Sequence, residues 1–192
     1  MKVRLLFLLL NVAFMQHEKF FSTADDSIVY KGQLIRDVLW DYKGHGSVIG
    51  MSNWPQKFST CGGKSQSPIN IEFSKVVKNR KLELKFGNYY TPLVRPWIEN
   101  IGHTVAVSSQ DFKKHWITGN VVNNATYYFH DFHFHWGVNS AVGSEHKING
   151  RGTVLELHLV HYNSKYATIE DSVNKTDGLV VLGVLYKTVS TQ

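Results

Sequence analysis

Tyr127–Trp136 reads Tyr-Tyr-Phe-His-Asp-Phe-His-Phe-His-Trp, and its aromatic composition predicts a β-strand. Alternate residues of a strand face the same side, so Asp131, His133 and His135 share one face. The aromatic side chains between them face the other side and are apolar enough to enter a core. Two histidines two positions apart on a strand can present their rings to one metal ion. This stretch therefore predicts a buried strand and part of a metal site.

A second predicted strand supplies a third histidine. Residues 155–161 read Leu-Glu-Leu-His-Leu-Val-His, so Glu156, His158 and Val160 face together, whereas His161 faces the other way. If the two strands are neighbours, His158 completes a three-histidine set. Three protein ligands with an open fourth position are typical of a catalytic zinc site. His161 is interpreted as a hydrogen-bonded core histidine.

Each strand also places a carboxylate beside a candidate ligand. Asp131 lies two residues before His133, and Glu156 lies two residues before His158. Metal-bound histidines usually donate their second ring N–H to a carboxylate or carbonyl, so both partners stand where such a site needs them. A His-x-His pair by itself is weak support for a metal site. A cupin-type site uses the same pair with a nearby glutamate, but residues 137–141 contain no acid.

The rest of the chain favours one mainly β domain. The 192 residues are 43% hydrophobic and 13% aromatic, and clusters of Gly, Asn or Pro separate the runs that predict strands. Further strands are predicted at Lys81–Phe86, Thr104–Val107, Thr153–Tyr162 and Leu179–Val189. Residues 25–65 are interpreted as extended loop, with a short helix at Ser27–Leu39. The histidines at positions 17, 45, 115 and 130 are interpreted as surface or capping residues.

The N-terminus predicts secretion. Lys2 and Arg4 precede an apolar run at Leu5–Leu10, the pattern of a signal peptide, and a small-x-small site ends at Ala24. The run is too short to span a bilayer, and no later run is long enough, so no membrane span is expected. Residues 1–24 are therefore predicted to be a signal peptide. Glycosylation acceptor tripeptides begin at Asn124 and Asn174, which supports an extracellular location weakly.

The charge distribution and the single cysteine limit the kinds of molecule that the chain is expected to bind. The net charge is +6, but the basic residues are scattered, which favours a solvated surface over nucleic-acid binding. Cys61 is the only cysteine of the sequence. In a secreted chain it is free, pairs with another chain, or has its partner in a segment absent from this chain.

Several motifs, in order, resemble the α-carbonic anhydrase signature. The zinc-site segments that carry the resemblance are Phe132–Gly137, Gly143–His146 and Glu156–His161. Outside them, Gln66–Ile71, Asn100–His103, Asp177–Gly183, Trp40–Tyr42 and Trp54 are also similar to family motifs. The resemblance covers about Trp40–Lys187. It implies a twisted, mostly antiparallel sheet with small helices, in a partial domain at 40–192 that follows an N-terminal extension at 25–39.

The resemblance also implies a mechanism. His133, His135 and His158 would hold Zn²⁺, and a zinc-bound hydroxide would convert CO₂ reversibly to bicarbonate and a proton. The other roles it implies are His103 as proton shuttle, Tyr42 at the polar edge, Glu145 as the residue that orients the hydroxide through a threonine, and Val160, Leu179 and Val181 as the apolar wall for CO₂. From the residues alone these last three would be core.

The chain departs from the family in three places. Asp131 stands where the family usually has glutamine, which predicts a raised pKa of the zinc-bound water. Gly50-Met51 replaces a Gly-Pro, with little expected effect. The chain ends at Gln192, before roughly the last third of the family's domain.

The third departure carries the largest expected consequences. The last third supplies the threonine that pairs with Glu145, the other pocket wall and, in secreted relatives, the cysteine that pairs with Cys61. We therefore expect an unpaired Glu145 and exposed sheet edges. Two alternatives to an active enzyme follow: a zinc-binding fragment with weak catalysis, and a secreted non-catalytic binding or matrix module. The three intact histidines disfavour the second.

Overall fold

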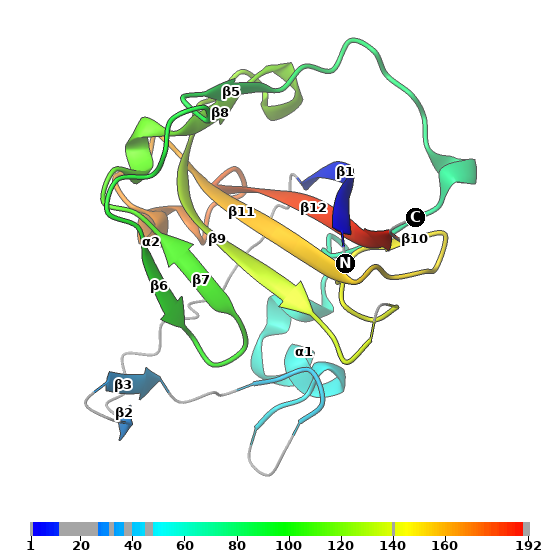
Figure 1. Cartoon of the computed structure of the whole chain (residues 1–192), viewed down its shortest axis with the longest axis vertical. Coiled ribbons are helices and arrows are strands. Elements are labelled where there is room, and N and C mark those ends of the chain that lie inside the picture. Colours follow the sequence, from blue (N-terminus) through cyan, green and yellow to red (C-terminus); the bar gives the residue numbers. More distant parts are fainter. Residues whose placement is uncertain are drawn as a thin grey trace.

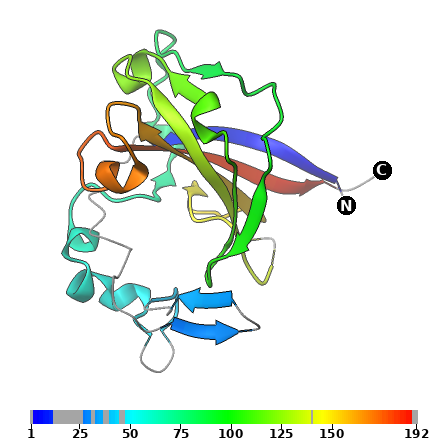
Figure 2. The same cartoon turned by 90° about the vertical axis from the view of Figure 1, so that its left-hand side faces the viewer.

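One curled antiparallel sheet dominates the structure, a computed structural model that describes residues 2–11, 27–30, 33–36, 40–44, 48–139 and 141–189 (Figures 1 and 2). Its strands run in the order β1-β12-β11-β9-β7-β6, and β8 pairs with β9 and β5. In the same order their bounds are Lys2–Asn11, Leu179–Val189, Leu155–Asn163, Tyr127–Trp136, Val105–Ser108 and Trp97–Asn100, then Trp116–Thr118 for β8 and Lys85–Gly87 for β5. Every pairing described in this sheet is antiparallel.

The remaining described elements are short. Two pairs of strands lie outside the main sheet: β4 (Asn70–Ile71) with β10 (Lys147–Ile148), which are parallel, and β2 (Ser27–Tyr30) with β3 (Gln33–Arg36), which form a hairpin. The α-helices are α1 (Trp54–Lys57) and α2 (Ile169–Ser172); the 3₁₀ helices are Met51–Asn53, Ser59–Gly62, Phe73–Lys75, Phe112–Lys114 and Asn120–Val122. The fold is therefore mainly β, as predicted.

The strand pattern separates a core from a site. Val180 and Leu182 of β12 are fully buried and pack with Ile117, Val122 and Tyr127 in the main hydrophobic cluster. Val181, between them, faces the other side of the sheet, where it lines a cavity. His161 of β11 is also fully buried on the core side, and Tyr89 hydrogen-bonds its Nε2. The interpretation of His161 as a core histidine is confirmed.

The predicted helix at Ser27–Leu39 is wrong within its described residues. Residues 27–30 and 33–36 are β2 and β3, paired from Ser27 with Arg36 to Tyr30 with Gln33, and residues 31–32 and 37–39 lie outside the described part. Ile28, Val29 and Tyr30 are β-branched or aromatic residues, which fit strands better than helices.

The outer edge of β12 is paired, contrary to the expected exposed edge. β1 runs antiparallel along it, from Lys2 opposite Val189 to Asn11 opposite Val181. Backbone groups that would otherwise be open to another chain are thus paired within this one. At the opposite end of the sheet β6 pairs with β7 and with no other described strand, so β6 is the edge strand of the described sheet there. The predicted cleavage site at Ala24 lies outside the described residues.

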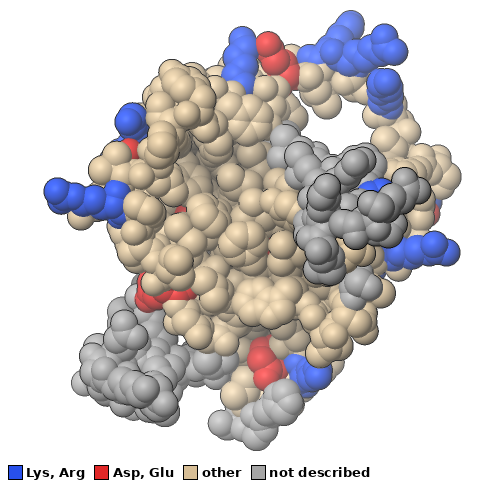
Figure 3. Space-filling model, viewed as in Figure 1, with Lys and Arg blue, Asp and Glu red and all other residues tan. Residues whose placement is uncertain are grey.

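Charge is spread over the surface. On the face seen in Figure 3, lysine and arginine side chains lie around the rim, and uncharged residues form the middle. Among the described residues there is no helix of the length and apolar character needed to cross a membrane.

Candidate metal centre

Strand register brings the three predicted ligands together. In the β9–β11 ladder His133 lies opposite His158, and His135 lies opposite Glu156. Residues directly opposite in an antiparallel pair share a face, so all four side chains project from the same side of the sheet. One ring nitrogen from each of the three histidines lies within 4.8 Å of the others. The predicted neighbouring of the two strands is confirmed.

Each histidine has one nitrogen within hydrogen-bond distance of a partner outside the three-histidine set, and its other nitrogen faces the space between the three rings or the Glu145 carboxylate. His133 Nδ1 lies 3.1 Å from Asp131 Oδ1, and His158 Nε2 lies 2.8 Å from Glu156 Oε1. His135 Nδ1 lies 3.2 Å from the Tyr42 hydroxyl oxygen. The nitrogens that remain are Nε2 of His133, Nε2 of His135 and Nδ1 of His158.

This donor set fits zinc. His135 Nε2 and His158 Nδ1 are 3.1 Å apart, and ligands about 2.0–2.1 Å from a tetrahedral zinc ion stand about 3.3 Å from one another. Burial, followed by the neighbouring His158 and His133, lowers the pKa of His135 to about 3, so its ring is neutral at pH 7. The lone pair on His135 Nε2 therefore points toward His158 Nδ1, and a cation between the two atoms could bind both.

Glu156 is the buried carboxylate that orients His158. Its carboxylate is fully buried and accepts four hydrogen bonds: from the backbone N–H groups of Glu145 (2.9 Å) and His146 (2.8 Å), and from the His146 (2.5 Å) and His158 (2.8 Å) rings. Desolvation raises its pKa, but the hydrogen bonds from His146 and His158 outweigh that effect and hold the pKa far below its usual value. Glu156 is thus an ionised, fully satisfied partner and not a metal ligand itself.

Asp131 is the corresponding partner on β9. Its side chain is 15% exposed. Desolvation raises the pKa of Asp131, but the hydrogen bonds from His130 and His133 have a larger effect and lower the pKa to about 2. The carboxylate is therefore ionised at neutral pH.

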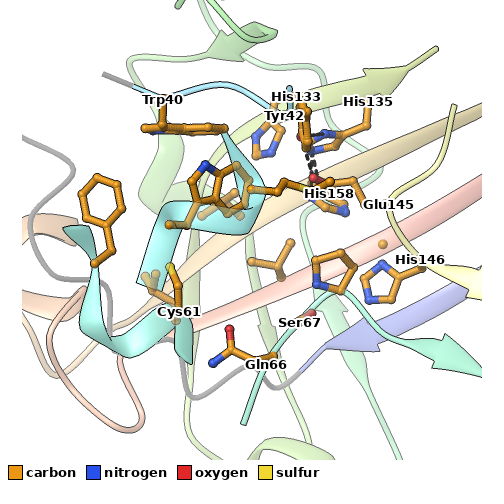
Figure 4. A pocket seen from close by; sticks show the side chains of 18 of the residues that line it. Trp40, Tyr42, Cys61, Gln66, Ser67, His133, His135, Glu145, His146 and His158 are labelled. Carbon is orange, nitrogen blue, oxygen red and sulfur yellow. Dashed lines mark hydrogen bonds and ion pairs between the residues drawn. The ribbon is translucent and has the colours of Figure 1, made fainter. Parts of the chain in front are cut away.

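Glu145 has a partner, contrary to expectation. The Tyr42 hydroxyl donates to Glu145 Oε1 at 2.6 Å, and Glu145 Oε2 lies 3.3 Å from His135 Nε2. The segment that carries Glu145 is pressed onto the start of β11, because a Cβ on Gly143 would lie 1.9 Å from the Val154 carbonyl oxygen. Figure 4 shows Tyr42, Glu145 and the three histidines converging. The separation of 103 residues between Tyr42 and Glu145 hides this contact from sequence inspection.

A cavity of about 380 Å³ opens beside the histidines. The three residues predicted to form its apolar wall, Val160, Leu179 and Val181, all line it. The register explains why: Val160 lies opposite Val181, and His158 lies opposite Gly183, so one face of β11 and β12 carries the wall and the ligand side by side. The other lining residues include Trp40, Trp54, Phe58, Cys61 and Pro68. Apolar side chains thus adjoin a convergent polar group.

Comparison with known proteins identifies the family. Residues 49–192 match the model of the eukaryotic-type carbonic anhydrases. The chain belongs to the carbonic anhydrase family. It is 37% identical over 146 residues to carbonic anhydrase 6 of Homo sapiens, covering 74% of this chain and 46% of that protein. It is 36% identical over 145 residues to carbonic anhydrase 1 of Mus musculus, covering 75% and 55%. The chain spans about half the length of the curated relatives it matches.

His103, which is predicted to be the proton shuttle of this carbonic anhydrase chain, is not among the residues that line the cavity. Its ring stacks on Trp40, which does, with ring centroids 4.1 Å apart and an angle of 31° between the planes. Burial lowers the pKa of His103 below its usual value. The glycosylation candidates Asn124 and Asn174 are both exposed: Asn124 lies in a turn before β9, and Asn174 follows α2.

Of the histidines interpreted as surface residues, His115 is buried in the interior, whereas the His130 side chain is partly exposed. His115 is 3% exposed, and its Nε2 lies 3.1 Å from the Thr91 carbonyl oxygen. His130 Nδ1 lies 2.7 Å from Asp131 Oδ2. The sequence signal for His130 was its place next to Asp131, but strand parity puts neighbouring residues on opposite faces. Positions 17 and 45 lie outside the described residues.

Proposed function

We propose that this chain binds one Zn²⁺ through His133, His135 and His158 and catalyses the reversible hydration of CO₂ to bicarbonate and a proton. The observation that supports the proposal is the convergence of three imidazole nitrogens at the wall of a partly apolar cavity. Three protein ligands leave a coordination position open, as catalytic zinc sites do. When bound, zinc supplies a Lewis acid that allows water to react as hydroxide near neutral pH.

The other site residues have distinct tasks in this proposal. Asp131, Glu156 and Tyr42 fix the second nitrogen of each ligand, so each ring keeps the tautomer and orientation that metal binding needs. Val160, Leu179 and Val181 offer CO₂, an apolar molecule, an apolar surface beside the histidines. Glu145 orients the attacking oxygen. His103, whose ring contacts the cavity residue Trp40, carries the released proton toward solvent.

The cellular setting is part of the proposal. Residues 1–24 act as a signal peptide, 25–39 form an N-terminal extension, and the carbonic anhydrase domain occupies 40–192. Cleavage of the signal peptide would remove β1 and expose the outer edge of β12, as expected from the sequence. The charged and apolar pattern of the first residues and the exposed acceptors Asn124 and Asn174 support secretion and glycosylation.

Stopped-flow CO₂ hydration by the purified, zinc-loaded chain tests the activity. We expect turnover above the buffer rate that disappears in His135→Ala, because this variant removes one of three ligands. The control is Lys113→Ala, which changes a charged, exposed residue of the Phe112–Lys114 helix. Zinc bound at one ion per chain with no rate above that of His135→Ala would contradict the proposed activity.

A second candidate function, zinc binding with weak or no turnover, is favoured by the position of Glu145. Its Oε2 lies 3.3 Å from His135 Nε2 and 3.8 Å from His158 Nδ1, so the carboxylate can compete with water for the fourth coordination position. Glu145→Gln separates the candidates. Loss of hydration activity in this variant supports the first function. Weaker zinc binding, with hydration negligible in both proteins, supports the second.

A further inference from the structure

Strand β9 contains a β-bulge beside the metal centre. Val160 of β11 lies opposite Asp131, but the next residue, His161, lies opposite Phe129, so His130 is an extra residue on β9. In a bulge two residues of one strand face a single residue of the other, and the local twist changes. The strict alternation of side chains fails at this point, which allows His130 and Asp131 to meet.

The bulge creates a three-residue hydrogen-bonded chain. His130 Nδ1 lies 2.7 Å from Asp131 Oδ2, and Asp131 Oδ1 lies 3.1 Å from His133 Nδ1. The exposed fractions of the side chains are 35% for His130, 15% for Asp131 and 20% for His133. The chain therefore connects a half-exposed histidine to a candidate zinc ligand. The His130 ring also packs edge-on against Tyr162, with centroids 6.5 Å apart.

We propose that His130 is a positioning residue: its Nδ1–H holds Asp131 Oδ2 and thereby aims Oδ1 at His133 Nδ1–H, which presents His133 Nε2 to the metal. A mostly buried carboxylate needs hydrogen bonds to both oxygens, and Asp131 has one from each histidine. Without His130, the carboxylate is free to turn about χ2, a soft torsion, toward solvent. The zinc part of this inference rests on the proposed function, and the tautomer part does not.

Two variants of His130 separate hydrogen bonding from packing. In His130→Asn the side-chain amide nitrogen takes the place of ring Nδ1 and keeps the donor but loses the ring. In His130→Phe a ring of similar size remains against Tyr162, without a donor. The first measurement is ¹⁵N NMR of the histidine side chains in the metal-free full chain, which reports the tautomer of His133. The second is zinc affinity, by competition with a chromophoric chelator.

We expect wild-type protein and His130→Asn to hold His133 in the Nδ1–H tautomer, and His130→Phe to show a mixture. Loss of a direct outer-sphere partner typically weakens metal affinity 10- to 100-fold, so the loss of this more distant group should weaken it up to about 10-fold. An unchanged tautomer of His133 and an unchanged zinc affinity in His130→Phe would overturn the inference. Equal losses of zinc affinity in His130→Phe and His130→Asn would also overturn it, because they would show that His130 acts through packing and not through its hydrogen bond. If wild-type protein bound no zinc while the tautomer still followed the donor, the proposed function would fail and the positioning role would stand.

Discussion

Glu156, Asp131 and Tyr42 orient the ligating histidines, and these three residues differ in their burial and in the number of their hydrogen bonds. Glu156 is fully buried with four hydrogen bonds, whereas Asp131 is 15% exposed and contacts two histidine rings. Tyr42 uses one hydroxyl, which donates to Glu145 and accepts from His135. Burial raises the pKa of the Tyr42 hydroxyl, so it stays protonated and remains a donor. Substitutions should therefore be most costly at Glu156.

Glu156→Gln should weaken both zinc binding and the fold. The amide nitrogen that replaces one carboxylate oxygen would face donors that need an acceptor, which costs about 1–3 kcal/mol of unfolding free energy. Zinc affinity should fall about 10- to 100-fold because His158 loses its charged partner. Chelator competition and urea unfolding measure the two effects. Glu99→Gln, on the exposed edge strand β6, is the matched control. Equal affinity in the two variants would mean that Glu156 does not act on His158.

Asp131→Gln should move the pH midpoint of CO₂ hydration to lower pH. Asp131 is ionised beside His133 and pushes negative charge toward the metal, which favours the protonated form of the reactive water. A neutral amide removes that charge and keeps an acceptor for His133. The pH–rate profile of the variant measures the shift. An unchanged midpoint would show that the charge of Asp131 does not determine the pH at which the enzyme becomes active.

At the scale of elements, the two longest strands of the domain were predicted closely and most short ones were not. The exceptions are the ten-residue β1, which was interpreted as part of a signal peptide, and the four-residue β7, which was predicted to within one residue. The bounds of β9 and β12 match the predicted ranges, because long aromatic and β-branched runs have few alternatives to a buried strand. The strand predicted at Lys81–Phe86 is reduced to β5 at Lys85–Gly87, and β6 and β8 were missed. Strands of three or four residues are held by their pairing partners and have little pattern of their own. Parity placed the ligands correctly, and it failed only at the bulge.

Buried His161, on the core face of β11, should make the stability of the fold depend on pH. Burial lowers the pKa of His161 to about 4, against about 6.5 in an unfolded chain. Between these values the unfolded chain binds more protons, so the unfolding free energy should fall as the pH drops from 6.5 to 4, by at most about 3 kcal/mol. His161→Gln should lose that part of the dependence. Urea unfolding of both metal-free proteins at pH 7 and pH 4.5 measures it, and equal changes in the two would contradict the assignment.

At the scale of the whole molecule, the site joins parts far apart in sequence. Residues 40–42 and 51–68 include one side of the cavity lining, the sheet forms the other side, and Tyr42 reaches Glu145 across that space (Figure 4). No local pattern signals such a contact, which is why the sequence predicted the ligands and their carboxylates but left Glu145 without a partner. The ligands themselves need only β9 and β11, whose pairing is among the most extensive in the sheet.

The central claim is that these two strands assemble one zinc site from three histidines. Equilibrium dialysis of the metal-free chain against Zn²⁺, with metal counted by atomic emission, tests it most directly. We predict one tightly bound zinc ion per chain, and loss of that ion in each of His133→Ala, His135→Ala and His158→Ala, while His115→Ala, in a buried histidine away from the centre, retains it. Tight binding that survived in any of the three ligand variants would contradict the claim.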